Sequence, residues 1–146
     1  YFPDKEHLLL AYLTREVGRF MDGATAAVNE AVGARARLRV LVDHQARYFA
    51  TNAGAGQDLA GIASPDRYPD FAACFAPVRD LLVRIIREGI HEGVFRALDP
   101  ISAARMTLAL LGAYRVPLAR ATISPEEATD SVLDFLLHGI DANTAG

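Results

Sequence analysis

Hydrophobic residues recur every three or four positions along almost the whole chain, which is the spacing of residues on one face of an α-helix. The first series lies between Asp4, a predicted N-cap, and Gly33, a predicted stop. Its apolar face consists of Leu9, Leu13, Val17, Phe20, Met21, Ala24 and Val28. A second series covers residues 35–50, where Asp43 and Arg47 are spaced for an ion pair on one helix. The pattern therefore predicts two long helices joined by a turn at Gly33.

Glycine, proline and aspartate interrupt this pattern at residues 51–69, which predicts a loop with one short helix at 57–62. The helical spacing returns at Asp70 and continues to Gly93. Its apolar stripe consists of Val78, Leu81, Leu82, Ile85, Ile86 and Ile90. A third long helix is therefore expected in this part of the chain.

Two start signals that contain proline introduce the last helices. Asp99-Pro100 combines an acidic N-cap with proline at the first helical position and predicts a helix over 100–114. Val116-Pro117 is expected to break or kink the chain, and Ser124-Pro125-Glu126-Glu127 has the pattern of a capping box that opens a helix over 124–139. Because the sequence contains no strand pattern, it predicts an all-α domain of about six helices.

The last two predicted helices carry apolar residues on more than one side. A helix of this kind needs two packing partners, which are its own core and a second chain, or two elements of one subunit. The first interpretation predicts a homodimer through a defined set of residues, and the pattern leaves the second open. The predicted interface consists of Leu108, Leu111, Gly112, Leu133, Leu136, Leu137 and Ile140.

Composition excludes several classes of protein. The 146 residues have a formal net charge of −3 and no basic cluster, so the chain as it stands is a poor binder of nucleic acid. Its longest apolar stretches fall well short of the roughly 20 residues that span a bilayer, so no membrane partner is expected. A single cysteine, Cys74, excludes an internal disulfide and fits a reducing cytoplasm.

Catalytic chemistry finds little support in the motifs. Glu88 and His91 form half of a di-metal carboxylate motif, but the second half is missing. Cys74 lies among apolar neighbours, as inert core cysteines do, and the sequence contains no nucleophile elbow or phosphate-binding glycine loop. We therefore expect no enzyme, metal or cofactor. An all-α enzyme or metal-binding bundle that uses Glu88 and His91 is the alternative, and a helical scaffold without a ligand is a third interpretation.

A ligand pocket between the helices is the remaining candidate site. Apolar side chains with a few polar groups are typical of small-molecule sites, and several such residues fall on potentially inward faces. They are Phe20, Met21, His44, Tyr48, Phe49, Phe71, Cys74, Phe75, Met106, Leu110 and Tyr114. For any one of these residues a purely structural role in the core is the simpler interpretation.

The N-terminal stretch "YFPDKEHLLLAYL" resembles the end of the helix-turn-helix domain in the tetracycline-repressor (TetR) family of regulators. In that family an aromatic pair closes the recognition helix, and a Pro-(Ser/Asp)-Lys-Glu-x-Leu link opens the next helix. Residues 81–114 are similar to the helix, Gly-x-Phe-Arg turn and Asp-Pro restart of the family's C-terminal domain. The resemblance implies a TetR-like C-terminal regulatory domain that dimerises through a four-helix bundle of the last two helices.

The resemblance also implies a function. Residues 1–5 would be the tail of a helix-turn-helix domain and its link, and residues 6–146 a ligand-binding and dimerisation domain. Tyr1 and Lys5 would contact DNA phosphates, which positions a protein without reading bases. The implied protein is a homodimeric, cytoplasmic repressor that releases operator DNA when a small, largely apolar effector binds.

Overall fold

The computed structural model describes residues 2–51, 73–140 and 142 of the chain. Within these ranges the chain forms six α-helices and no β-strand, so the predicted all-α class is confirmed. The helices are α1 (Phe2–Glu30), α2 (Ala34–Thr51), α5 (Ala76–His91), α6 (Pro100–Ala113), α7 (Arg115–Ala119) and α8 (Pro125–Ile140). No helix in the described ranges is long and apolar enough to cross a membrane. The predicted short helix at 57–62 lies outside the described residues.

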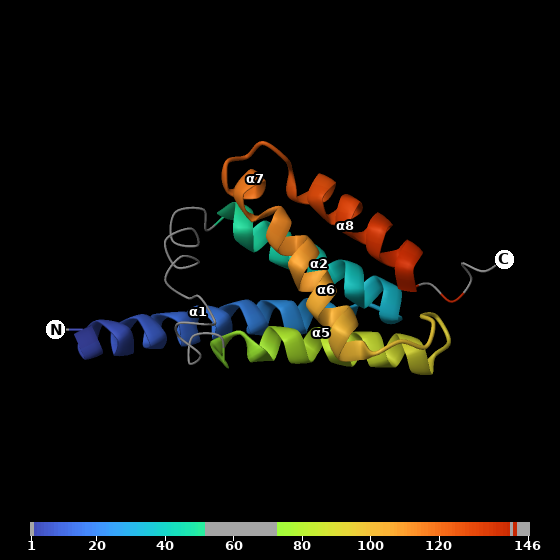
Figure 1. The fold of residues 1–146 in the computed structure, drawn as a ribbon, viewed down its shortest axis with the longest axis horizontal. Coiled ribbons are helices and arrows are strands. Elements are labelled where there is room, and N and C mark those ends of the chain that lie inside the picture. The colour runs from blue at the N-terminus through green and yellow to red at the C-terminus, as the bar shows by residue number, and fades with distance from the viewer. Residues whose placement is uncertain (1, 52–72, 141, 143–146) are drawn as a thin grey trace.

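Helix α2 lies at the centre of the bundle and packs against α1, α5, α7 and α8. Figure 1 shows α1 and α5 side by side along the long axis, with α6 crossing them and α8 on the opposite side of α2. The N-terminal end of α1 projects beyond the ends of the other described helices (Figure 1). This arrangement leaves one end of the longest helix outside the packed bundle.

The core consists of the predicted apolar faces. Leu38 and Val42 from α2 are fully buried, as are Ile85 and Ile86 from the predicted stripe of α5. Val28, Ala104 and Val132 bring α1, α6 and α8 to the same cluster. Burial of a large aliphatic side chain contributes about 1.5–3 kcal/mol, so this shared cluster is what holds the helices together.

Local signals in the sequence place most of the helix ends. The Asp99 carboxylate accepts the backbone N–H of Ser102 at 3.0 Å, and the Ser124 hydroxyl accepts that of Glu127 at 3.1 Å. Gly33 has a φ of +91° and Gly93 one of +78°, the left-handed conformation that glycine adopts without steric cost. Both N-caps and both predicted stops are therefore confirmed.

The start of α1 differs from the prediction. The helix begins at Phe2, so Asp4 lies within its first turn and is not the N-cap. Pro3 is compatible with this earlier start, because the N–H that proline lacks has no partner in the first turn of a helix. A break is found near Val116-Pro117 but earlier than predicted: α6 ends at Ala113, and both residues lie inside the five-residue α7.

The turn between α5 and α6 rests on a close contact between Gly89 and Phe95. Phe95 is only 2% exposed, and its ring lies directly on the backbone of Gly89. A Cβ atom at Gly89 would lie 2.1 Å from Cδ2 of Phe95. Arg96 donates two hydrogen bonds to α8. Its side-chain Nε donates to the Gly139 carbonyl oxygen at 2.7 Å, and its backbone N–H donates to the Ile140 carbonyl oxygen at 2.7 Å. The turn is thereby attached to the last turn of α8.

Ion pairs connect α2 to its neighbours. The Arg47 guanidinium contacts Asp43 at 2.8 Å, as predicted, and Glu126 of α8 at 2.7 Å. Arg39 pairs with Asp130 of α8. All these side chains are substantially exposed, so each pair contributes little to stability, and the main effect is to define how α8 is oriented on α2.

Four residues of the predicted dimer interface lie in the core of the chain itself. Leu111, Leu133, Leu136 and Ile140 are each at most 6% exposed and belong to the shared cluster. Leu108 and Leu137 are half-buried against it, and Gly112 is exposed. The prediction that all seven form an outer interface is wrong for the four buried residues, because they face α2 and the other helices of their own subunit.

Candidate functional site

An aromatic cluster lies between α1 and α2. We use this name, the α1–α2 cluster, for Tyr12, Glu16 and Phe20 on α1 with His44 and Tyr48 on α2. The three α1 residues are four positions apart and so form one row along the helix. The Phe20 ring contacts the Tyr48 ring edge to face, with centroids 5.5 Å apart, and the His44 ring with centroids 5.1 Å apart. The structure thus brings together three of the predicted site residues.

His44 packs closely on α1 at the end of this row. A Cβ atom at Gly23 would lie 3.1 Å from Nε2 of His44, so the absence of a side chain at position 23 makes room for the imidazole. His44 and Tyr48 are four residues apart on α2, so both rings face α1 one helical turn from each other. Gly23 was not among the predicted site residues, because an isolated glycine within a helical pattern gives no indication of what packs on it.

Tyr48 is half-buried, and its surroundings disfavour ionisation. Burial raises the pKa of Tyr48 above its ordinary value, and the negative charge of Glu16 and the nearby Tyr12 phenol raise it further. The phenol is therefore a neutral group that lies close enough to Glu16 to be affected by its charge. The sequence pattern did not predict Tyr12 and Glu16 as site residues, although they lie eight and four positions before Phe20.

The Glu16 side chain is only 14% exposed. Its ion-pair partner in the described part of the chain is Arg19, at 3.5 Å, and the Arg19 side chain is 75% exposed. The guanidinium of Arg15 lies over the Tyr12 ring, 5.8 Å from its centroid. The α1–α2 cluster is therefore a largely apolar site with one shielded carboxylate.

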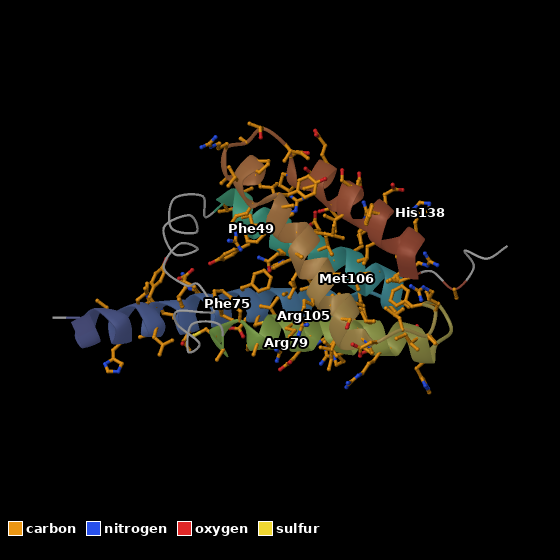
Figure 2. The ribbon with its side chains drawn as sticks, viewed as in Figure 1. Phe49, Phe75, Arg79, Arg105, Met106 and His138 are labelled. Atoms are coloured by element: carbon orange, nitrogen blue, oxygen red, sulfur yellow. The ribbon has the colours of Figure 1, made fainter. Side chains whose placement is uncertain are left out.

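The residues just before α5 contact α1 at Thr14, on a different face of the helix from the row of Tyr12, Glu16 and Phe20. The Thr14 hydroxyl and the Cys74 thiol are 3.5 Å apart, which joins the middle of α1 to the residues just before α5. Cys74 is half-buried, and Phe75 beside it is exposed. Phe49, near the end of α2, and Phe75 lie toward the end of the bundle from which α1 projects (Figure 2). Phe71 lies outside the described residues.

The other predicted site residues are less close together. Met21 and Leu110 are half-buried against the core, and so are Phe49 and Tyr114, which also contact a small cluster around Leu118. The guanidinium of Arg115 covers the Phe49 ring at 5.2 Å. Met106 is 57% exposed on α6 (Figure 2), so the prediction that it lines a site between helices is wrong. It lies on the outer side of α6, whose Ala103 and Ala104 face the core.

The alternative metal site is not supported by the contacts of its residues. The Glu88 carboxylate accepts the Arg37 guanidinium at 2.6 Å and lies 3.6 Å from Arg84, whereas His91 is exposed at the end of α5. Among the described residues no group of three His, Cys, Asp or Glu side chains could hold a metal ion. Glu88 therefore acts as a link between α5 and α2.

Comparison with known proteins identifies the fold. No family model and no curated protein matches the chain. A TetR transcription regulator from Haloarcula marismortui ATCC 43049 superposes with a TM-score of 0.75 at 25% identity, over 97% of this chain and 78% of that one. A protein described as a transcriptional regulator from Saccharomonospora viridis, solved in complex with choline, superposes with a TM-score of 0.74 at 23% identity, over 96% and 77%. The chain has a TetR-like fold, and the similarity supports a transcription regulator.

Proposed function

We propose that this chain is the ligand-binding and dimerisation part of a TetR-like transcriptional repressor, which releases operator DNA when a small, largely apolar molecule binds. The observation that carries the proposal is the TetR-like fold over 97% of the chain. The α1–α2 cluster adds to it, because apolar surroundings with a few polar groups are typical of small-molecule sites. The proposal includes a cytoplasmic location, where such a protein meets both DNA and metabolites.

The proposed DNA-binding part is a helix-turn-helix domain joined to the N-terminal end of α1. The resemblance of the stretch that contains Tyr1 and Lys5 to the corresponding link in TetR regulators supports this arrangement. In it these two residues contact phosphates, residues 1–5 form the link, and residues 6–146 form the regulatory domain. The net charge of −3 is compatible with it, since phosphate binding would rest on the attached domain.

Helix α1 is the proposed connection between effector and DNA. One continuous helix carries Phe20 of the cluster and the projecting end to which the DNA-binding domain would be joined. A ligand that fits the cluster better in one position of α1 shifts the population toward that position by its difference in affinity. Two DNA-binding domains must lie about 34–36 Å apart to enter successive major grooves, so a displaced α1 lowers operator affinity.

The proposed dimer uses the outer surfaces of α6 and α8. Ile101 and Met106 on α6 are 46% and 57% exposed, and Phe135 on α8 is 72% exposed. Large apolar side chains so exposed on neighbouring helices are typical of interfaces between subunits. Three residues of the predicted interface, Leu108, Gly112 and Leu137, are at least partly exposed and would contact the partner at the edge of this surface. The four buried residues pack beneath it in the core of their own subunit.

Precedent for a ligand in this fold comes from the S. viridis protein, which was solved with choline. Choline is small and carries apolar methyl groups, so its presence there supports an effector site in a protein of this fold. For this chain we propose the α1–α2 cluster as part of that site, with Phe20, His44 and Tyr48 as contacts. The proposed site also includes Met21 on α1 and Cys74 and Phe75 just before α5, on another face of α1.

The experiment that tests the proposal measures DNA binding by the full-length gene product. Fluorescence anisotropy with DNA from the region beside its own gene, at two salt concentrations and with random DNA as competitor, is the direct assay. We expect tight binding that resists the competitor and weakens with salt as phosphate contacts are screened. Binding no tighter than to random DNA would contradict the proposal.

A further inference from the structure

We propose that the α1–α2 cluster selects organic cations, and that the Glu16 carboxylate and the rings of Phe20 and Tyr48 recognise a substituted ammonium group. This inference rests on the proposed effector site and specifies its ligand as a largely apolar molecule that carries one positive charge. Two independent observations support it, which are the weak neutralisation of Glu16 and the ring arrangement around it.

The charge of Glu16 is shielded from water but poorly paired. A carboxylate that loses most of its hydration is stable only if it is paired or hydrogen-bonded. Among the described residues its ion pair is with Arg19, whose guanidinium is 3.5 Å away and mostly in solvent. A pair of this geometry neutralises little charge. A cation in the cluster would supply the missing partner.

The rings next to Glu16 suit the same ligand. Tyr12 and Phe20 lie one helical turn to either side of Glu16, and Tyr48 contacts Phe20 from α2. Aromatic rings attract cations through the negative potential of their faces, and methylated ammonium groups combine this attraction with apolar contact. The guanidinium of Arg15, 5.8 Å from the Tyr12 ring centroid, shows that a ring of this row already attracts a positive charge.

Other ligand classes fit less well. An anion would face the Glu16 carboxylate, and Arg15 and Arg19, which come just before and three residues after Glu16 on α1, are both exposed. A neutral apolar ligand would displace water from Glu16 without replacing its interaction. His44 contacts Gly23 and Phe20, which lie seven and four residues after Glu16 on α1.

The test compares three probes that share one six-carbon chain and differ in charge. These probes are hexyltrimethylammonium, hexan-1-ol and hexanoate, and their binding to the 146-residue chain is measured by isothermal titration calorimetry. We expect the cation to bind about tenfold more tightly than the alcohol, and hexanoate to bind most weakly. Equal affinity of the cation and the alcohol, or tighter binding of hexanoate, would overturn the proposal.

Two variants locate the selectivity. Glu16→Gln removes the charge and keeps the shape, and we expect it to bring the affinity ratio of cation to alcohol close to one. The matched control is Glu30→Gln, an exposed position on the same helix, which should leave the ratio unchanged. Circular dichroism shows whether both variants are folded. A ratio that survives Glu16→Gln in a folded protein would overturn the role of Glu16.

The DNA-binding assay separates this proposal from the function on which it rests. If the gene product binds its operator but the 146-residue chain shows no preference for the cation, the ligand class is wrong and the regulator stands. If the cation binds selectively through Glu16 but no specific DNA binding is found, the ligand class stands and the regulator is wrong.

Discussion

A single methyl group added at Gly89 is expected to destabilise the protein although it is added inside a helix. Its Cβ atom would lie 2.1, 2.4 and 2.9 Å from Cδ2, Cε2 and Cγ of Phe95, far inside van der Waals contact. Phe95 is 2% exposed, so its ring has no free space into which to move. Overpacking of a core costs about 1–3 kcal/mol, and expulsion of the ring would cost about 3–5 kcal/mol. The better helix propensity of alanine offsets only about 1 kcal/mol of this loss of stability.

The net loss expected for Gly89→Ala is thus up to about 2 kcal/mol if the ring stays overpacked in the core and about 2–4 kcal/mol if it is expelled. A loss of one or two kcal/mol is already a large fraction of the stability of a domain. Urea denaturation followed by circular dichroism measures it as a lower midpoint. The matched control is Gly18→Ala in α1, where a Cβ atom meets nothing within 4 Å, and its midpoint should stay the same or rise.

A double-mutant cycle tests the cause of that loss. Phe95→Ala removes the ring, so adding Gly89→Ala to it should cost nothing further, and the two effects should be strongly non-additive. If Gly89→Ala is as stable as the native protein, or if the two losses simply add, the close contact of the Phe95 ring with Gly89 does not control the stability of this turn.

Two further predictions concern the outer surface and acid stability. Phe135→Glu should convert the proposed dimer to monomer in sedimentation without loss of helix. Leu136→Glu should unfold the chain instead, because the Leu136 side chain is buried. A dimer that is unchanged by Phe135→Glu would exclude this surface as the interface. The hydrogen bond from the Ser102 hydroxyl, with that from its backbone N–H, lowers the pKa of Asp99 below its ordinary value. The contribution of the ionised Asp99 to the free energy of unfolding is complete at pH values above the pKa of Asp99 in the unfolded chain. It is lost as the pH falls through the pKa of Asp99 in the folded protein. Asp99→Asn should therefore flatten the decrease in stability at acid pH in urea titrations, and an unchanged slope would contradict this.

Helix ends could be predicted from the sequence because their causes are local. Asp99-Pro100 and Ser124-Pro125 carry both the capping side chain and the proline within two residues, so no distant contact was needed. The start of α1 was placed too late, because a proline near the start of a helix is compatible with more than one first residue.

Contacts between helices could not be predicted, since they depend on which faces meet. Leu136 and Phe135 are adjacent and equally apolar, yet Leu136 lies in the core and Phe135 is exposed. Periodicity shows that α8 has two apolar sides and does not show which one faces α2. The assignment of the interface to Leu136 failed for this reason.

The candidate site was only partly visible for a related reason. Phe20, His44 and Tyr48 were predicted as apolar or polar groups on inward faces, and the structure brings them together. Glu16 belongs to the same row, but a charged residue in a helix is usually solvated, and only the packing of α2 against α1 shows that it is shielded. Whether these residues bind an effector stays a prediction.

The length of α1 has a mechanical consequence. A helix of 29 residues is about 43 Å long. If it tilts by about 5° around the turn at Gly33, its projecting end moves by roughly 4 Å, more than the width of one base-pair step. Side-chain displacements of about 1–2 Å near Phe20, less than half-way along that radius, suffice for such a tilt. The projecting end of α1 therefore converts small packing differences in the bundle into movements on the scale of DNA geometry.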